Sequence, residues 1–102
     1  MPDEVQQVFG FVLYHAQIGL LHPDAKQLKG FGSAGILEIV EDWRGDAYRA
    51  VYTVRFAEAV YVLHCFQKKS KQGAETPKQE MNLIRARLKE AEALATAKPE
   101  LL

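Results

Sequence analysis

Basic residues gather at two places in this chain where they could hold a phosphate group. Arg49 lies in the alternating apolar stretch 48–56, and a lysine cluster follows the apolar stretch 60–66. The cluster consists of Lys68, Lys69, Lys71 and Lys78. A guanidinium can grip two phosphate oxygens at once, and ammonium groups add positive charge. A rigid sheet with such cations at its edge is a candidate surface for binding or cleaving nucleic acid.

Composition limits where that affinity could come from. The chain has 102 residues, with thirteen basic residues against thirteen acidic ones, so its net charge is zero. Affinity for nucleic acid therefore requires uneven placement of charge. The placement is uneven, because Glu38, Glu41 and Asp42 form an acidic group separate from the lysine cluster. The length and a hydrophobic fraction of 48% predict one globular domain over 1–102.

Other classes of protein are disfavoured by what the sequence lacks. Cys65 is its one cysteine, so an intramolecular disulfide is excluded and a reducing compartment is expected. The histidines at 15, 22 and 64 lack the spacing of metal ligands. No stretch is apolar enough for a membrane span, and the first residues are unlike a signal peptide. We expect a cytoplasmic protein with no metal, no cofactor and no membrane contact.

The elements that would position the basic residues follow from hydrophobic spacing. Apolar residues three and four apart predict an amphipathic helix over 3–20, and 24–29 is expected to form a short second helix. A final helix is predicted to begin with Thr76 as N-cap and Pro77 at its first position, and to end near Ala95. Between them we predict an antiparallel meander of three strands, over 36–41, 48–56 and 60–66, with a turn at 43–46.

Four runs of residues carry a resemblance to a known family: Leu37–Glu41, Tyr48–Tyr52, Val60–Lys71 and Thr76–Pro77. With the final helix they resemble the RelE/ParE toxin superfamily, and most closely its HigB-type and phage-derived gene-product-forty-nine-like branch. The likeness extends from about Pro2 to Leu94. It implies an α+β fold, in which an N-terminal helical hairpin and a C-terminal helix pack on a small antiparallel sheet. It also implies a type II toxin that cleaves mRNA on the ribosome and is neutralised by a helix-turn-helix antitoxin.

The resemblance also assigns roles to single residues. Arg49 matches the strand arginine of the family, and Lys69 and Lys71 match its basic pair, so these three are the expected catalytic residues. We expect RNA contacts from Lys68, Arg55 and Lys78. The acid–base residues of ribosome-dependent relatives do not carry over, because acidic residues replace lysines on the strand at 37–41 and no tyrosine follows Tyr61. The titratable candidates for these roles are Glu38, Glu41 and His64.

A further departure concerns the sheet, and other readings stay open. Relatives begin with a strand that this sequence lacks, which predicts an unpaired sheet edge and pairing with a second copy.

Arg49 and Arg55 could simply pair with acidic neighbours across the sheet, and His64 could be a half-buried structural histidine. The chain could then be an inactive relative that only binds an antitoxin. It could also be a ParE-like inhibitor of gyrase, because a shared fold does not fix function.

Overall fold

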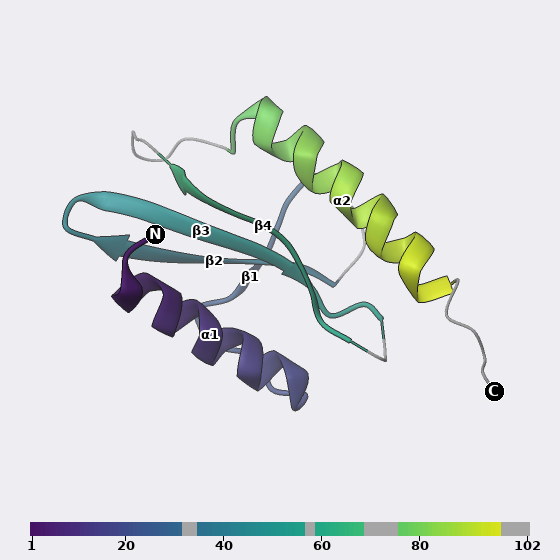
Figure 1. The fold of residues 1–102 in the computed structure, drawn as a ribbon, viewed down its shortest axis with the longest axis horizontal. Helices are drawn as coiled ribbons and strands as arrows, with labels where there is room; N and C mark the ends of the chain where they lie inside the picture. The colour runs from purple at the N-terminus through teal and green to yellow at the C-terminus, as the bar shows by residue number, and fades with distance from the viewer. Residues whose placement is uncertain (32–34, 57–58, 69–75, 97–102) are drawn as a thin grey trace.

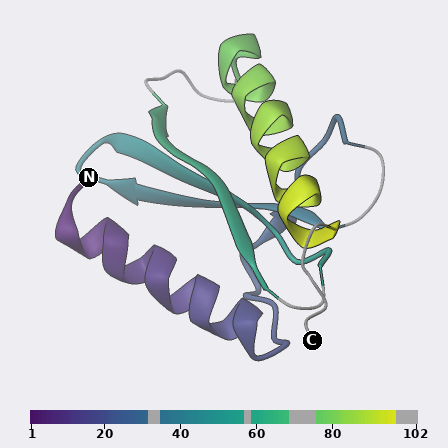
Figure 2. The ribbon, with the colours of Figure 1, turned by 45° about the vertical axis from the view of Figure 1, so that its right-hand side comes forward.

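A computed structural model of the chain describes residues 1–31, 35–56, 59–68 and 76–96. Within these ranges, two helices pack on opposite faces of a four-stranded antiparallel sheet of order β1-β2-β3-β4 (Figures 1 and 2). The elements are α1 Asp3–Gln17, β1 Lys26–Gln27, β2 Ile36–Trp43, β3 Asp46–Thr53, β4 Tyr61–Lys68 and α2 Lys78–Thr96. The predicted α+β class and the antiparallel meander are confirmed. No helix in the described ranges has the length and apolarity to cross a membrane.

The predicted second helix over 24–29 is wrong, because this segment adds a strand to the sheet. Lys26 and Gln27 form β1 and pair with Glu38 and Leu37 of β2. The Leu28 amide then donates to the Ile36 carbonyl at 2.9 Å. A helix of six residues is barely stable by itself, whereas the edge of β2 offers ready backbone partners. The N-terminal helical hairpin is therefore a single helix followed by an edge strand.

Helix α1 also ends earlier than predicted, at Gln17 rather than Leu20. Gly19 has a positive φ of 88°. Its amide donates to the Ala16 carbonyl at 3.1 Å, and the Leu20 amide donates to the His15 carbonyl at 2.8 Å. This pair of bonds is the Schellman closure, which glycine favours because the left-handed conformation costs it little.

The hairpin between β2 and β3 fixes the position of the central strands. Its two-residue loop consists of Arg44 and Gly45, with φ of 52° and 87°. Two successive positive φ values are the mark of a type I′ turn, whose twist matches that of the flanking strands. The predicted turn at 43–46 is thus confirmed.

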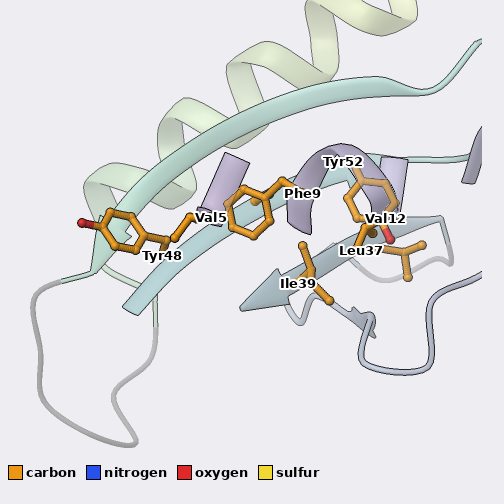
Figure 3. Packing of buried hydrophobic residues seen from close by; sticks show 8 residues of the cluster. Val5, Phe9, Val12, Leu37, Ile39, Tyr48 and Tyr52 are labelled. Atoms are coloured by element: carbon orange, nitrogen blue, oxygen red, sulfur yellow. The ribbon is translucent and has the colours of Figure 1, made fainter. Parts of the chain in front are cut away.

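The two faces of the sheet bury separate clusters. On one face, Val5, Phe9 and Val12 of α1 pack against alternate residues of β2 and β3, which are Leu37, Ile39, Tyr48, Ala50 and Tyr52 (Figure 3). On the other face, Ile84 and Ala91 of α2 pack against Leu28, Ile36, Val51, Leu63 and Phe66. Arg49 is two residues before Val51 on β3, so both side chains lie on the face that α2 covers.

The sheet keeps edges at which a further strand could pair. Strand β4 is the last of the order, and β1 covers only Leu37 and Glu38 of β2. Among the described residues, 39–43 of β2 have no strand beside them on the side away from β3. Pairing of two copies through such an edge stays a prediction.

Candidate functional site

Arg49 lies on the α2 face of the sheet and forms an ion pair with Glu38. In register, Arg49 of β3 lies opposite Val40 of β2, and Glu38 lies opposite Val51. The two side chains are therefore diagonal neighbours on one face, within reach of each other. The Arg49 Nη1 donates to Glu38 Oε2, and the two side chains are only 17% and 14% exposed. The pairing considered from sequence is thus confirmed for Arg49.

The residue before α2 adds a second contact to the guanidinium. Arg49 Nη1 also lies 3.5 Å from Thr76 Oγ1, a weak bond at this length. The prediction that Thr76 is the N-cap of α2 is wrong. The first bond of the helix runs from the Met81 amide to the Pro77 carbonyl, at 3.0 Å. Pro77 therefore takes the cap position, one residue later than expected. The Thr76 hydroxyl is left to contact Arg49.

A pocket of about 460 Å³ opens beside this pair. Glu38 and Arg49 line it from the sheet, Thr76 and Met81 line it from the start of α2, and the segment that begins with β1 forms its remaining wall, through Lys26, Gln27, Leu28, Lys29 and Gly30. We call this the Arg49 pocket. Arg49 Nε is also buried and has no hydrogen-bond partner within the described residues. Among the described lining residues, the pocket brings Lys26, Lys29 and Arg49 around the carboxylate of Glu38.

Sequence reasoning missed Lys26 and Lys29. In a helix over 24–29 these two residues would have had no fixed relation to Arg49. In the structure, Lys26 lies opposite Glu38 in the register of β1 and β2. The signal in the sequence was the opposite charge of Lys26 and Glu38, which suits a cross-strand pair. It could be recognised only once the segment was known to be a strand.

Only one of the three titratable candidates accompanies Arg49. Glu41 lies opposite Tyr48, whose side chain belongs to the α1 face, so Glu41 lies on the other side of the sheet from Arg49. Glu38 lies in the pocket. His64 lies on the α2 face but is held by α2, as described next.

His64 is a half-buried histidine between the sheet and α2. Its Nε2 lies 2.6 Å from Glu80 Oε1, and its ring stacks on Phe66 with centroids 4.9 Å apart. Arg87 Nη1 donates to the Leu63 carbonyl at 2.9 Å and lies 3.5 Å from His64 Nδ1. Leu63 is the extra residue of a bulge, because Val51 pairs with His64 and Tyr52 with Val62. The structural role considered for His64 is therefore supported.

The α2 residues that contact His64 lie on a different flank of the helix from the one that lines the Arg49 pocket. Glu80 and Arg87 are seven residues apart, two helical turns, and so share the flank of α2 that faces β4. Met81 lines the pocket on the other flank. Ile84 lies between these flanks and is fully buried against the sheet. In the structure, His64 thus contacts Glu80 and is not among the described residues that line the pocket.

The remaining predicted RNA contacts lie apart or outside the described residues. Arg55 pairs with Glu92 at 3.2 Å near the far end of α2, and not with the acidic residues of β2 that were considered from sequence. Glu92 is about 16 Å along the helix from Met81, at 1.5 Å per residue. Lys78 is exposed at the first residue of α2, and Lys68 ends β4 in register with Ala47. The predicted catalytic lysines Lys69 and Lys71 lie outside the described residues.

One other reactive group lies on the sheet. Burial raises the pKa of the Cys65 thiol above its ordinary value, which makes it a weaker nucleophile at neutral pH. Among the described residues, no three His, Cys, Asp or Glu side chains cluster in a way that could hold a metal ion.

Comparison with known proteins places the chain in a family. No curated protein sequence and no solved structure matches it significantly. Residues 1–89 match the sequence profile of the family described as "Phage derived protein Gp49-like (DUF891)". This family is associated with the toxins of toxin–antitoxin systems, which suggests an antitoxin as partner. Because the match covers most of the chain, this protein belongs to the phage-derived Gp49-like family.

Proposed function

We propose that this chain is the toxin of a type II toxin–antitoxin pair, that it cleaves mRNA on the translating ribosome, and that a helix-turn-helix antitoxin neutralises it. Membership of the Gp49-like family supports the toxin part of this proposal. The observation that carries the enzymatic part is the Arg49 pocket, where a guanidinium and a carboxylate are fixed together in an open recess of the sheet. The likeness to HigB-type toxins favours mRNA as the substrate.

The pocket suggests how the two residues would divide the work. Glu38 accepts the proton of the RNA 2′-hydroxyl, and the 2′-oxygen attacks the adjacent phosphorus. Arg49 donates to the phosphorane oxygens, whose negative charge grows in the transition state. The bond to the 5′-oxygen breaks, and that oxygen takes a proton from water or from Lys69 or Lys71. The products are a cyclic phosphate and a 5′-hydroxyl end.

The ion pair is compatible with both roles. Before substrate arrives, Glu38 and Thr76 orient the guanidinium, so its position costs little to fix when RNA binds. The outward part of a guanidinium remains available, because its five N–H groups exceed what one carboxylate oxygen and one hydroxyl accept.

Induced expression in a bacterial host tests the proposal. We expect growth arrest and new mRNA 5′ ends in translating extract with wild type. Arg49→Ala should lower cleavage by about 10²–10³-fold, and Glu38→Gln by about 10²-fold or more. Lys89→Gln, an exposed change on α2, is the matched control and should cleave normally. If wild type neither arrests growth nor cuts mRNA, the proposal is wrong.

A second function is favoured by the same ion pair. Opposite charges that satisfy each other on a sheet also occur in purely structural roles, and Arg49 and Glu38 do so here. The chain would then be an inactive relative that binds an antitoxin. This alternative predicts a tight complex with the product of a neighbouring helix-turn-helix gene and no RNA cleavage by wild type. Inhibition of gyrase in a supercoiling assay would instead identify a ParE-like toxin.

A further inference from the structure

The wall of the Arg49 pocket contributed by β1 carries two cations that are fixed to the same sheet as Arg49. Lys26 pairs with Glu38 in the β1–β2 ladder. The Leu28 amide also donates to the Ile36 carbonyl of β2, which fixes the backbone directly before Lys29 to the sheet. The backbone of both lysines is therefore held beside the pocket, while their exposed side chains keep access to solvent.

The charge of the pocket is unbalanced. Among the described residues that line it, Glu38 is the one acidic residue, and it is already paired with Arg49. Among the described residues, neither Lys26 nor Lys29 has a carboxylate within salt-bridge distance. Arg85 adds a further cation next to the lining residue Gly30. If Gly30 carried a Cβ atom, the Arg85 Nη2 would lie 3.6 Å from it. A pocket with this excess of positive charge favours an anionic ligand.

The pocket lining also has an apolar, closely shaped part, which includes residues of the same β1 segment. A Cβ atom on Gly30 would lie 3.0 Å from the Met81 Cε, so the backbone of Gly30 and the methionine meet directly. Leu28 is buried next to them, and the Arg85 guanidinium lies 5.3 Å from the ring centroid of Phe31. A volume of about 460 Å³ falls in the range of small-molecule sites. Cations next to hydrocarbon in one pocket lining suit a nucleotide, with its phosphate and its flat base.

We propose that the Arg49 pocket is a nucleotide subsite of single-stranded RNA. Lys26 and Lys29 hold a phosphate next to the one that Arg49 binds, and the base lies against Leu28 and Met81. This inference rests on the proposed function, since it names how that site takes its substrate. It also explains why a two-residue strand matters, because β1 places Lys26 and Lys29 beside the pocket.

Binding of an uncleavable RNA separates this inference from the question of catalysis. The probe is a fluorescent single-stranded oligonucleotide with 2′-O-methyl groups, measured by anisotropy over a series of salt concentrations. We expect Lys26→Gln and Lys29→Gln each to weaken binding about 3–10-fold. Each should also reduce the slope of log K against log salt by about 0.7, the value for one phosphate contact on a single strand. Lys89→Gln should leave both quantities unchanged.

The outcomes distinguish the two proposals. Unchanged affinity and slope in both lysine variants, with folding confirmed by circular dichroism, would overturn the subsite whether or not wild type cleaves RNA. Loss of affinity for the antitoxin but not for RNA would overturn it too, because the pocket would then be a protein contact. RNA binding that depends on Lys26 and Lys29 in a protein without cleavage activity would support the subsite and defeat only the endonuclease. In an active protein, the lysine variants should raise KM with little change in kcat.

Discussion

The two faces of the sheet bury different kinds of side chain. The face covered by α1 is a hydrocarbon cluster in which the tyrosine hydroxyls are the only polar side-chain groups among its buried residues. The face covered by α2 combines a hydrocarbon cluster with two partly buried pairs, Arg49–Glu38 and His64–Glu80. Removing a charge from water costs free energy that its partner only partly returns, so hydrocarbon of equal volume is often as stable. The paired charges that the described residues place on the α2 face therefore point to that face as the functional one.

The largest expected effect comes from emptying the α1 face. Phe9→Ala should lower the free energy of unfolding by about 3–5 kcal/mol, because the ring is 4% exposed and its removal leaves a cavity. Phe11→Ala on the same helix is the matched control, since Phe11 is 57% exposed, and should cost less than about 0.5 kcal/mol. Urea unfolding measures both. Equal losses would contradict the packing of Phe9 in the buried cluster of the α1 face.

The α2 face should respond through its charges. Glu38→Met leaves the Arg49 guanidinium partly buried and unpaired, and should cost about 1–3 kcal/mol. The double variant with Arg49→Met should lose less than the sum of the two single losses, because hydrocarbon replaces both charges.

The more exposed pair Arg55–Glu92 is the control for this cycle. Its side chains are 34% and 46% exposed, so Glu92→Gln should cost no more than about 1 kcal/mol. Additive losses at Glu38 and Arg49 would mean that the two residues are not coupled, and would remove the basis for assigning them a joint role.

The sequence predicted the central part of the fold because the signals there are local. The alternation along β3 places Tyr48, Ala50 and Tyr52 on one face and Arg49 on the other, as expected. The turn at Arg44 and Gly45 also follows from residue type, since Gly45 adopts a positive φ.

The parts that failed depend on contacts between distant segments. A two-residue strand has no periodicity to detect, and β1 exists only because the edge of β2 supplies its partners. Lys26 and Lys29 were missed for that reason. A contact between Arg49 and an acidic residue of β2 was considered from sequence. Whether the partner is Glu38 or Glu41 depends on the register of β2 and β3, which the sequence does not give. Helix α1 ends three residues before the predicted end, because the backbone at Gly19 closes it. The spacing of apolar residues does not reveal such a closure.

The pair between β4 and α2 should have a smaller effect on stability. Glu80→Gln removes the charge that faces His64 Nε2 at 2.6 Å and should cost about 1 kcal/mol. Glu90→Gln, an exposed change on the same helix, should be close to neutral. Because neither His64 nor Glu80 is among the described residues that line the Arg49 pocket, Glu80→Gln should leave RNA cleavage within about twofold of wild type at full folding. A cleavage loss as large as that of Glu38→Gln would show that His64 acts in the reaction.

The smallest expected effect tests the Tyr52 hydroxyl, which is buried in the α1 face. Tyr52 is fully buried, and its hydroxyl has no hydrogen-bond partner within the described residues. Removing an unsatisfied hydroxyl recovers its desolvation cost, so Tyr52→Phe should be as stable as wild type at pH 7, or more stable by about 1 kcal/mol. A loss of more than about 1 kcal/mol would show instead that the hydroxyl has a partner.

The same variant should change how stability depends on pH. Burial raises the pKa of Tyr52 above its ordinary value of 10.0, so the folded state holds this proton more tightly than the unfolded state. Above about pH 10 the unfolded chain loses the proton first, and the free energy of unfolding falls as pH rises toward the folded pKa. Tyr52→Phe removes this contribution, so its stability should fall less steeply between about pH 9.5 and 11. Equal slopes for wild type and Tyr52→Phe in urea unfolding would mean that the hydroxyl reaches solvent and that the α1 face is not closed around it.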